Sequence, residues 1–183
     1  FNIVRDIIKV ESVTSKKIDQ IGYIKVNSFQ VNSYEDFLNN LKNLRSEGIN
    51  GLIVDLRGNP GGLLDQAIKI SNIFLKDKLI VSTRGKDSRM DIDFFTKAGV
   101  VTKYLGPLVV LIDNGSASAS EIVAGALKNN NRAVIIGEKS FGKGTVQEVY
   151  KQNDGSAVKL TIAEYLNPNE YKVDKNGVIP HIE

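Results

Sequence analysis

The chain alternates short apolar runs with segments whose apolar residues recur at helical spacing. Four buried strands are predicted where the runs are rich in Val, Ile and Leu: residues 51–57, 79–84, 107–113 and 133–138. Between residues 34 and 47 the apolar positions recur every three or four residues, with Asn32 or Ser33 as a cap and Gly48 as a stop, which predicts a helix. Such alternation is typical of an α/β fold.

Both ends of the chain have stronger strand character than the middle. Residues 1–13 alternate apolar and polar side chains like a half-buried strand, and residues 21–26 form a second predicted strand. The polar stretch 14–20 between them is predicted to be a turn or hinge. Residues 146–166 alternate again, with a hairpin turn at 153–155. The ends are therefore expected to be β-rich.

Two strand-to-helix connections are built from small residues. GNPGG at 58–62 precedes a predicted helix at 63–75, and NGSASAS at 114–120 precedes a helix that runs to about Leu127. The first backbone N–H groups of a helix have no partner within the helix, so they can stabilise a negative charge. These two connections are the first places to look for chemistry.

Composition narrows the function classes. With 183 residues and 42% hydrophobic content, residues 1–183 are expected to form one domain. Lys and Arg (24) nearly balance Asp and Glu (21), and the charges are interspersed, so no nucleic-acid partner is expected. The chain has no Cys, which excludes thiolate catalysis, and its one His, His181, has no ligand cluster, so neither metal nor cofactor is expected.

A Ser/Lys pair is the best candidate for acyl-transfer chemistry. A serine hydroxyl needs a base, and the only His lies in the loop-like context VIPHIE near residue 183. Lys143 lies between Gly142 and Gly144, 25 residues after Ser118 (143 − 118 = 25). A free lysine titrates near about 10.4, and burial in an apolar pocket can lower that value by several units. Phe141 is expected to supply apolar cover for Lys143.

The spacing does not choose between three serines. Ser116, Ser118 and Ser120 all fall within the predicted strand-to-helix turn. If Ser118 attacks, the N–H of Ala119 would stabilise the oxyanion. A second donor would come from Gly61 or Gly62, where a backbone N–H can approach the substrate closely. Gln147, four residues after Lys143, could hydrogen-bond the lysine amine and fix its direction.

With these residues in view, the chain closely resembles the carboxyl-terminal processing peptidases, which are tail-specific serine proteases with a Ser/Lys dyad. The resemblance covers nearly the whole chain, in five segments: IGYIKVNSF (21–29), GLIVDLRGNPGGLL (51–64), NGSASASEIVAGAL (114–127), GEKSFGKGTVQ (137–147) and the closing NGVIPHIE. It implies an α/β core with the spiral fold of ClpP and crotonase proteins, with β-rich N-terminal and C-terminal segments.

The resemblance also implies a role for each candidate residue. Ser118 corresponds to the nucleophile, Lys143 to the general base and Gln147 to the residue that orients the lysine. Ala119 with Gly61 or Gly62 would form the oxyanion hole. Asn129 stands where many members have Asp, so any supporting role of that carboxylate is lost or replaced.

The expected partners follow from the same resemblance. They are protein or peptide substrates with apolar C-terminal ends. The resemblance also implies that the protein works outside the cytoplasm, in the bacterial envelope or the thylakoid lumen. There it could associate with the membrane surface. A PDZ domain is expected in the full-length protein just before the segment that matches Phe1, although these residues contain no PDZ pattern and no signal-peptide layout.

Two other functions stay open: a non-catalytic peptide-binding module, and a crotonase-like acyl-thioester enzyme that would bind coenzyme A.

Overall fold

A computed structural model describes residues 11–96 and 104–183 of the chain. Its first sheet has the strand order β1-β2-β3-β6-β7. All neighbours pair in parallel except β1, which is antiparallel to β2 at one edge. The strands span Val13–Ile18 (β1), Ile21–Val26 (β2), Gly51–Asp55 (β3), Leu108–Ile112 (β6) and Val134–Gly137 (β7).

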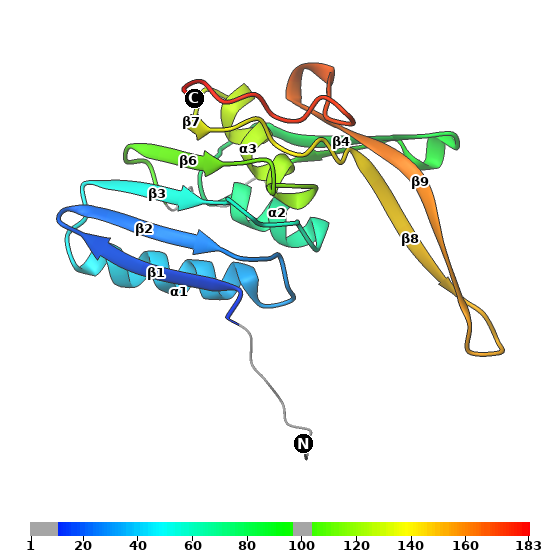
Figure 1. The fold of residues 1–183 in the computed structure, drawn as a ribbon, viewed down its shortest axis with the longest axis horizontal. Helices are drawn as coiled ribbons and strands as arrows, with labels where there is room; N and C mark the ends of the chain where they lie inside the picture. Colours follow the sequence, from blue (N-terminus) through cyan, green and yellow to red (C-terminus); the bar gives the residue numbers. More distant parts are fainter. Residues whose placement is uncertain (1–10, 97–103) are drawn as a thin grey trace, which may run out of the picture.

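The second sheet is antiparallel and has the order β10-β9-β4-β5, with β8 also paired to β9. Its strands are β4 (Leu79–Gly85), β5 (Ile92–Phe95), β8 (Thr145–Lys151), β9 (Ala157–Asn167) and β10 (Tyr171–Lys172). Short 3₁₀ turns lie at Ser88–Met90 (η1) and Pro168–Glu170 (η2). Figure 1 shows that β8 and the first half of β9 leave the body as a long hairpin.

Three α-helices in the described ranges complete the layers: α1 (Ser33–Ser46), α2 (Leu64–Ser71) and α3 (Ala119–Asn129). α1 packs against β1 and β2, whereas α2 and α3 pack against each other and both contact β4 of the second sheet. α3 is therefore buried on all sides, and its residues 119–127 are all buried. Within the described residues, no helix combines the length and the apolar content needed to cross a bilayer.

The predicted α/β fold is confirmed, but the turn predicted at 14–20 is wrong. Residues 13–18 form β1, and only Asp19 and Gln20 turn the chain into β2. The strand has a polar sequence because it lies at a sheet edge with residues 15–18 exposed, so alternation with an apolar face is not required there. Residues 1–10 of the predicted first strand lie outside the described residues.

Candidate active site

Ser118 occupies the sharp turn between β6 and α3. It is the N-cap of α3 and has φ 55° and ψ −112°. Few non-glycine residues adopt positive φ, and holding one there costs about 1–3 kcal/mol. A serine on a strained strand-to-helix turn at a helix N-terminus is the geometry in which proteins present a nucleophile.

The other two serines of this turn are structural. Ser116 is buried and donates its hydroxyl to the backbone carbonyl of Leu56 at 2.8 Å. Ser120 is also buried and donates to the carbonyl of Asn59 at 3.0 Å. Both bonds tie the turn to the end of β3 and the loop that follows it. Of the three serines that the sequence left open, only Ser118 belongs to the lining of the pocket that the described residues form in front of this turn.

This pocket has a volume of about 340 Å³ and brings together most of the candidate residues. Ser118, Lys143 and Gln147 all line it, although they come from the turn before α3, the loop before β8, and β8 itself. An apolar wall is contributed by the loop after β3, by α2, α3 and β8: Leu63, Leu64, Ile122 and Val146. A hydroxyl and an amine thus share a half-apolar cavity.

Backbone donors for an oxyanion lie beside Ser118. Ala119 and Gly62 line the pocket, and within the described residues neither backbone N–H has a hydrogen-bond acceptor. The N–H of Gly61 instead donates to Asn59 Oδ1 at 2.8 Å. Gly61 packs against the turn so closely that an added Cβ would lie 2.8 Å from the Cβ of Ser118. The geometry favours Ala119 with Gly62 as the donor pair, and gives Gly61 a packing role.

A buried carboxylate, Glu121, joins the two halves of the site. Its Oε2 accepts hydrogen bonds from the backbone N–H groups of Ser118 at 2.8 Å and Lys143 at 2.9 Å. Its Oε1 accepts from the Ser140 hydroxyl at 2.6 Å and the Gly142 N–H at 2.7 Å. Four donors compensate the burial of this charge. The sequence analysis missed Glu121, although Ser-x-x-Glu at a helix start is a capping-box signal.

Tyr165 of β9 closes the same cluster. Its hydroxyl lies 3.1 Å from the carbonyl of Ser118, 3.4 Å from Glu121 Oε2, and within hydrogen-bond reach of the Lys143 carbonyl. Burial, together with the charge of Glu121, raises the pKa of Tyr165 well above its ordinary value. The hydroxyl therefore keeps its proton and donates to one of these acceptors.

The loop that carries Lys143 is also held from the C-terminal side. Ser140 N–H donates to the carbonyl of Val178 at 3.1 Å, and Val178 N–H donates to the Ser140 hydroxyl at 2.6 Å. A Cβ on Gly144 would lie 2.4 Å from the backbone nitrogen of Asp174. Glycine next to Lys143 is thus required by a chain crossing at that point.

Phe141 does not have the role expected from the sequence. Its side chain is 65% exposed, and it is absent from the residues that line the pocket. Its backbone N–H is held by the carbonyl of Ser116 at 3.0 Å, which fixes the loop while the ring lies outside the pocket. The apolar cover near Lys143 comes instead from the wall of the pocket described above.

Some expected contacts are not formed in this structure. Within the described residues, no hydrogen bond links the Lys143 amine to the Ser118 hydroxyl, and Gln147 donates to Thr161 Oγ1 at 3.4 Å. Catalytic hydrogen bonds are often long in substrate-free enzymes and tighten when substrate binds. His181 lies away from the pocket lining, where its Nδ1 accepts a backbone N–H of β7 at 2.9 Å.

An ion pair anchors the loop that carries the glycines. Asp55 ends β3, is 1% exposed, and accepts hydrogen bonds from Arg57 Nε at 2.9 Å, Arg57 Nη2 at 2.7 Å and the Tyr23 hydroxyl at 2.5 Å. Burial acts to raise the pKa of Asp55, but the bonds from Arg57 and Tyr23 outweigh it and lower the pKa to about 2.

The Asp55 pair predicts a pH-dependent contribution to stability. Its stabilisation should be fully present above the ordinary pKa of 3.8 and be lost as the pH falls toward 2. The free energy of unfolding of wild type should exceed that of Asp55→Asn by about 2 kcal/mol at pH 6, and by much less near pH 2.5. Urea titrations of both proteins at the two pH values measure this difference. A difference independent of pH would contradict the prediction.

The chain is similar to known proteins over nearly its whole length. Residues 20–183 match Peptidase family S41. The chain belongs to this family. A carboxy-terminal-processing protease of Bartonella bacilliformis is 44% identical over 184 residues, which cover 98% of this chain and 42% of that protein. The carboxy-terminal processing protease CtpA of Bacillus subtilis is 41% identical, over 100% of this chain and 39% of its own length.

The S41 assignment extends to solved structures. The photosystem II D1 C-terminal processing protease superposes with a TM-score of 0.84 at 31% identity, over 96% of this chain and 48% of that protein. The chain thus spans less than half the length of these S41 relatives. The comparison confirms the family and its protease-core fold, which the sequence motifs had indicated.

Proposed function

We propose that this S41 chain is the core of a serine endopeptidase that cleaves protein substrates near an apolar C-terminal tail. One observation carries the proposal: Ser118, on a strained turn at the N-terminus of α3, shares a half-apolar pocket with Lys143. The S41 match and the names of the relatives support a peptidase over a peptide-binding module or a coenzyme A enzyme. The apolar wall suits an apolar substrate segment.

The chemistry uses Lys143 in both halves of the reaction. As a neutral amine, Lys143 takes the proton of Ser118 while Oγ attacks the scissile carbonyl. The N–H groups of Ala119 and Gly62 stabilise the oxyanion. The lysine ammonium gives its proton to the leaving amine, which leaves an ester on Ser118. Lys143 then takes a proton from a water that attacks the ester, and it returns this proton to Ser118 Oγ as the carboxylic acid product leaves. Gln147 orients the lysine amine in both steps.

Covalent labelling tests the proposal. A serine-directed fluorophosphonate should add once to the chain, at Ser118. Intact-mass and peptide mass spectrometry measure the adduct and its position, with Ser118→Ala as the matched control. Failure to label Ser118 at any pH, or equal labelling of Ser118→Ala, would contradict the proposed dyad.

The setting of the reaction is also a proposal. We propose that the full-length protein works outside the cytoplasm, with a PDZ domain that binds the substrate tail, near a membrane surface. In support, relatives named carboxyl-terminal-processing proteases are more than twice as long as this chain, and one is named as chloroplastic. Identifying the substrate proteins that accumulate when the gene is deleted would test this assignment.

A further inference from the structure

The hairpin of β8 and β9 has one face continuous with the pocket. Residues directly opposite each other on paired antiparallel strands point to the same side. The pairs Gln147/Thr161, Val149/Lys159 and Lys151/Ala157 therefore share one face, which we call the pocket face of the hairpin. Gln147 and Lys159 of this face both line the catalytic pocket. Figure 1 shows the hairpin projecting from the body beyond this point.

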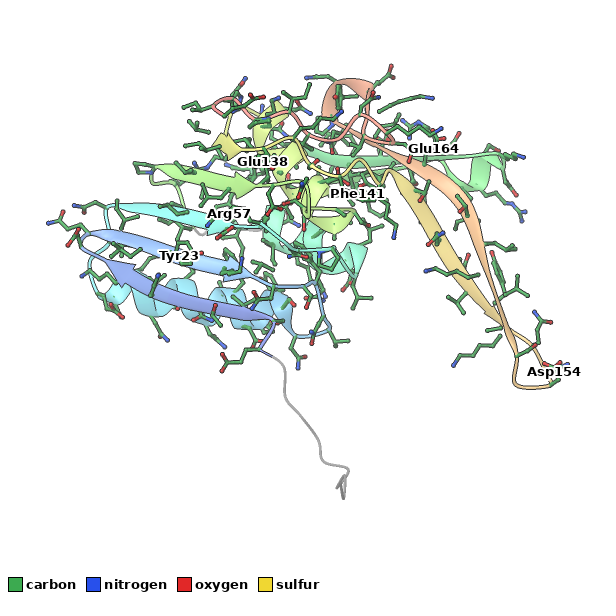
Figure 2. All side chains as sticks on the ribbon, in the orientation of Figure 1. Tyr23, Arg57, Glu138, Phe141, Asp154 and Glu164 are labelled. Carbon is green, nitrogen blue, oxygen red and sulfur yellow. The ribbon has the colours of Figure 1, made fainter. Side chains whose placement is uncertain are left out.

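The pocket face carries positive charge without a counterion. Lys159 and Lys151 are exposed, and among the described residues neither amine has a hydrogen-bond or ion-pair partner. The acids of the hairpin are used elsewhere. Glu148 lies on the opposite face and accepts from the Tyr150 hydroxyl at 2.8 Å. Asp154 lies at the tip, where it accepts from Ser156 at 2.7 Å (Figure 2).

Among the described residues, the pocket, like the pocket face of the hairpin, has positive side chains and no acidic partner for them. Its lining, within the described chain, includes Lys143 and Lys159 but no acidic side chain. Leu63, Leu64 and Ile122 of its apolar wall lie on the side of α2 and α3, whereas Val146 and Lys159 belong to the hairpin. A peptide that places its scissile bond at Ser118 thus meets apolar side chains on one side and an unpaired ammonium on the other.

We propose that Lys159 binds a carboxylate of the substrate close to the scissile bond and so determines specificity. This rests on the proposed peptidase function. The carboxylate is either an Asp or Glu side chain or the free C-terminal carboxylate, because a flexible lysine ammonium is a point charge that accepts both. Exposure and salt screening limit the gain, so a matched carboxylate should raise kcat/KM by about 3- to 10-fold.

Matched peptides test the proposal and separate the two sources. Each internally quenched peptide carries Glu or Gln at one position within about four residues of the cleaved bond. Four residues of extended peptide span about 13 Å. Each is made with a C-terminal acid and with an amide. Wild type should prefer the carboxylate at one side-chain position or at the C-terminus, and the preference should shrink when NaCl rises from about 0.05 to about 0.5 M.

Variants assign the preference to Lys159. Lys159→Gln should abolish it and Lys159→Glu should reverse it, whereas Lys42→Gln, which removes one exposed lysine on α1, should keep it. Equal loss of kcat/KM for Glu and Gln peptides in Lys159→Gln would overturn the proposal. So would a shifted pH–rate profile common to both peptides, because Lys159 would then act on Lys143 instead of the substrate.

A binding measurement keeps the proposal separate from catalysis. Fluorescence anisotropy reports binding of the same peptides to Ser118→Ala, which needs no turnover. A carboxylate preference that disappears in Ser118→Ala/Lys159→Gln would support Lys159 recognition even if wild type cleaves nothing and the peptidase function fails. Equal binding of Glu and Gln peptides by Ser118→Ala would overturn it.

Discussion

Replacing Lys143 with alanine should abolish peptide turnover while the fold is retained. The side chain faces the pocket and makes no hydrogen bond within the described residues, so its removal leaves no buried group unpaired. Without this amine, the proposed base for the Ser118 proton is lost. Loss of a catalytic base of this kind lowers kcat by about 10⁴-fold or more. Steady-state kinetics on a cleaved peptide and thermal unfolding measure both parts.

The matched variant Lys143→Arg tests whether Lys143 acts as a base or only supplies a positive charge. Arginine keeps the charge and length but stays protonated, so it cannot accept the proton of Ser118. Lys143→Arg should therefore be as inactive as Lys143→Ala and should resist the fluorophosphonate. Activity close to wild type in either variant would show that Lys143 is not the base.

Substituting Glu121 with glutamine should cost both stability and turnover. The amide nitrogen would replace an acceptor that now receives two hydrogen bonds, which leaves buried donors of Ser118 and Lys143 or of Ser140 and Gly142 unpaired. Breaking a buried charge network costs about 3 kcal/mol. The serine and lysine would also shift, and a displacement of about 1 Å can lower the rate by about 10²-fold.

The control for Glu121→Gln is Glu138→Gln, the same chemical change at an exposed position close to the site in sequence (Figure 2). Glu138→Gln should match wild type in urea stability and kinetics. For Glu121→Gln, kcat should fall more than KM changes, at a temperature well below the unfolding midpoint. That pattern identifies Glu121 as a positioning residue. A stability loss with unchanged kcat would leave it a purely structural role.

The sequence predicted the parallel sheet better than its partner. β3, β6 and β7 are short apolar runs, and β2 alternates buried with partly exposed residues. The predicted positions of all four agree with the structure to within about two residues. β1 was missed because an exposed edge strand tolerates polar residues. Membership of β4 in the antiparallel sheet was not predictable from its residues, because it depends on long-range pairing with β9.

The candidate site was predictable as a set of residues but not as an arrangement. Ser116, Ser118 and Ser120 look equivalent in the sequence, and burial against Leu56 and Asn59 separates them only in three dimensions. Phe141 was misplaced for a related reason, since nearness to Lys143 along a glycine-rich loop does not fix which way a side chain points. The direction of the Phe141 side chain depends on how the loop around Lys143 turns.

The site is held together by hydrogen bonds between segments that lie far apart in the sequence, so its parts must form in a certain order. The loop carrying Lys143 is hydrogen-bonded on one side to Glu121 and on the other to Val178. A chain still leaving a ribosome or a translocation pore with residues 173–178 inside could hold Ser118 on its turn but could not fix the lysine loop. On the proposed function, proteolytic competence would thus require synthesis and release of the chain through residue 178, which protects the polypeptide from its own nucleophile until then.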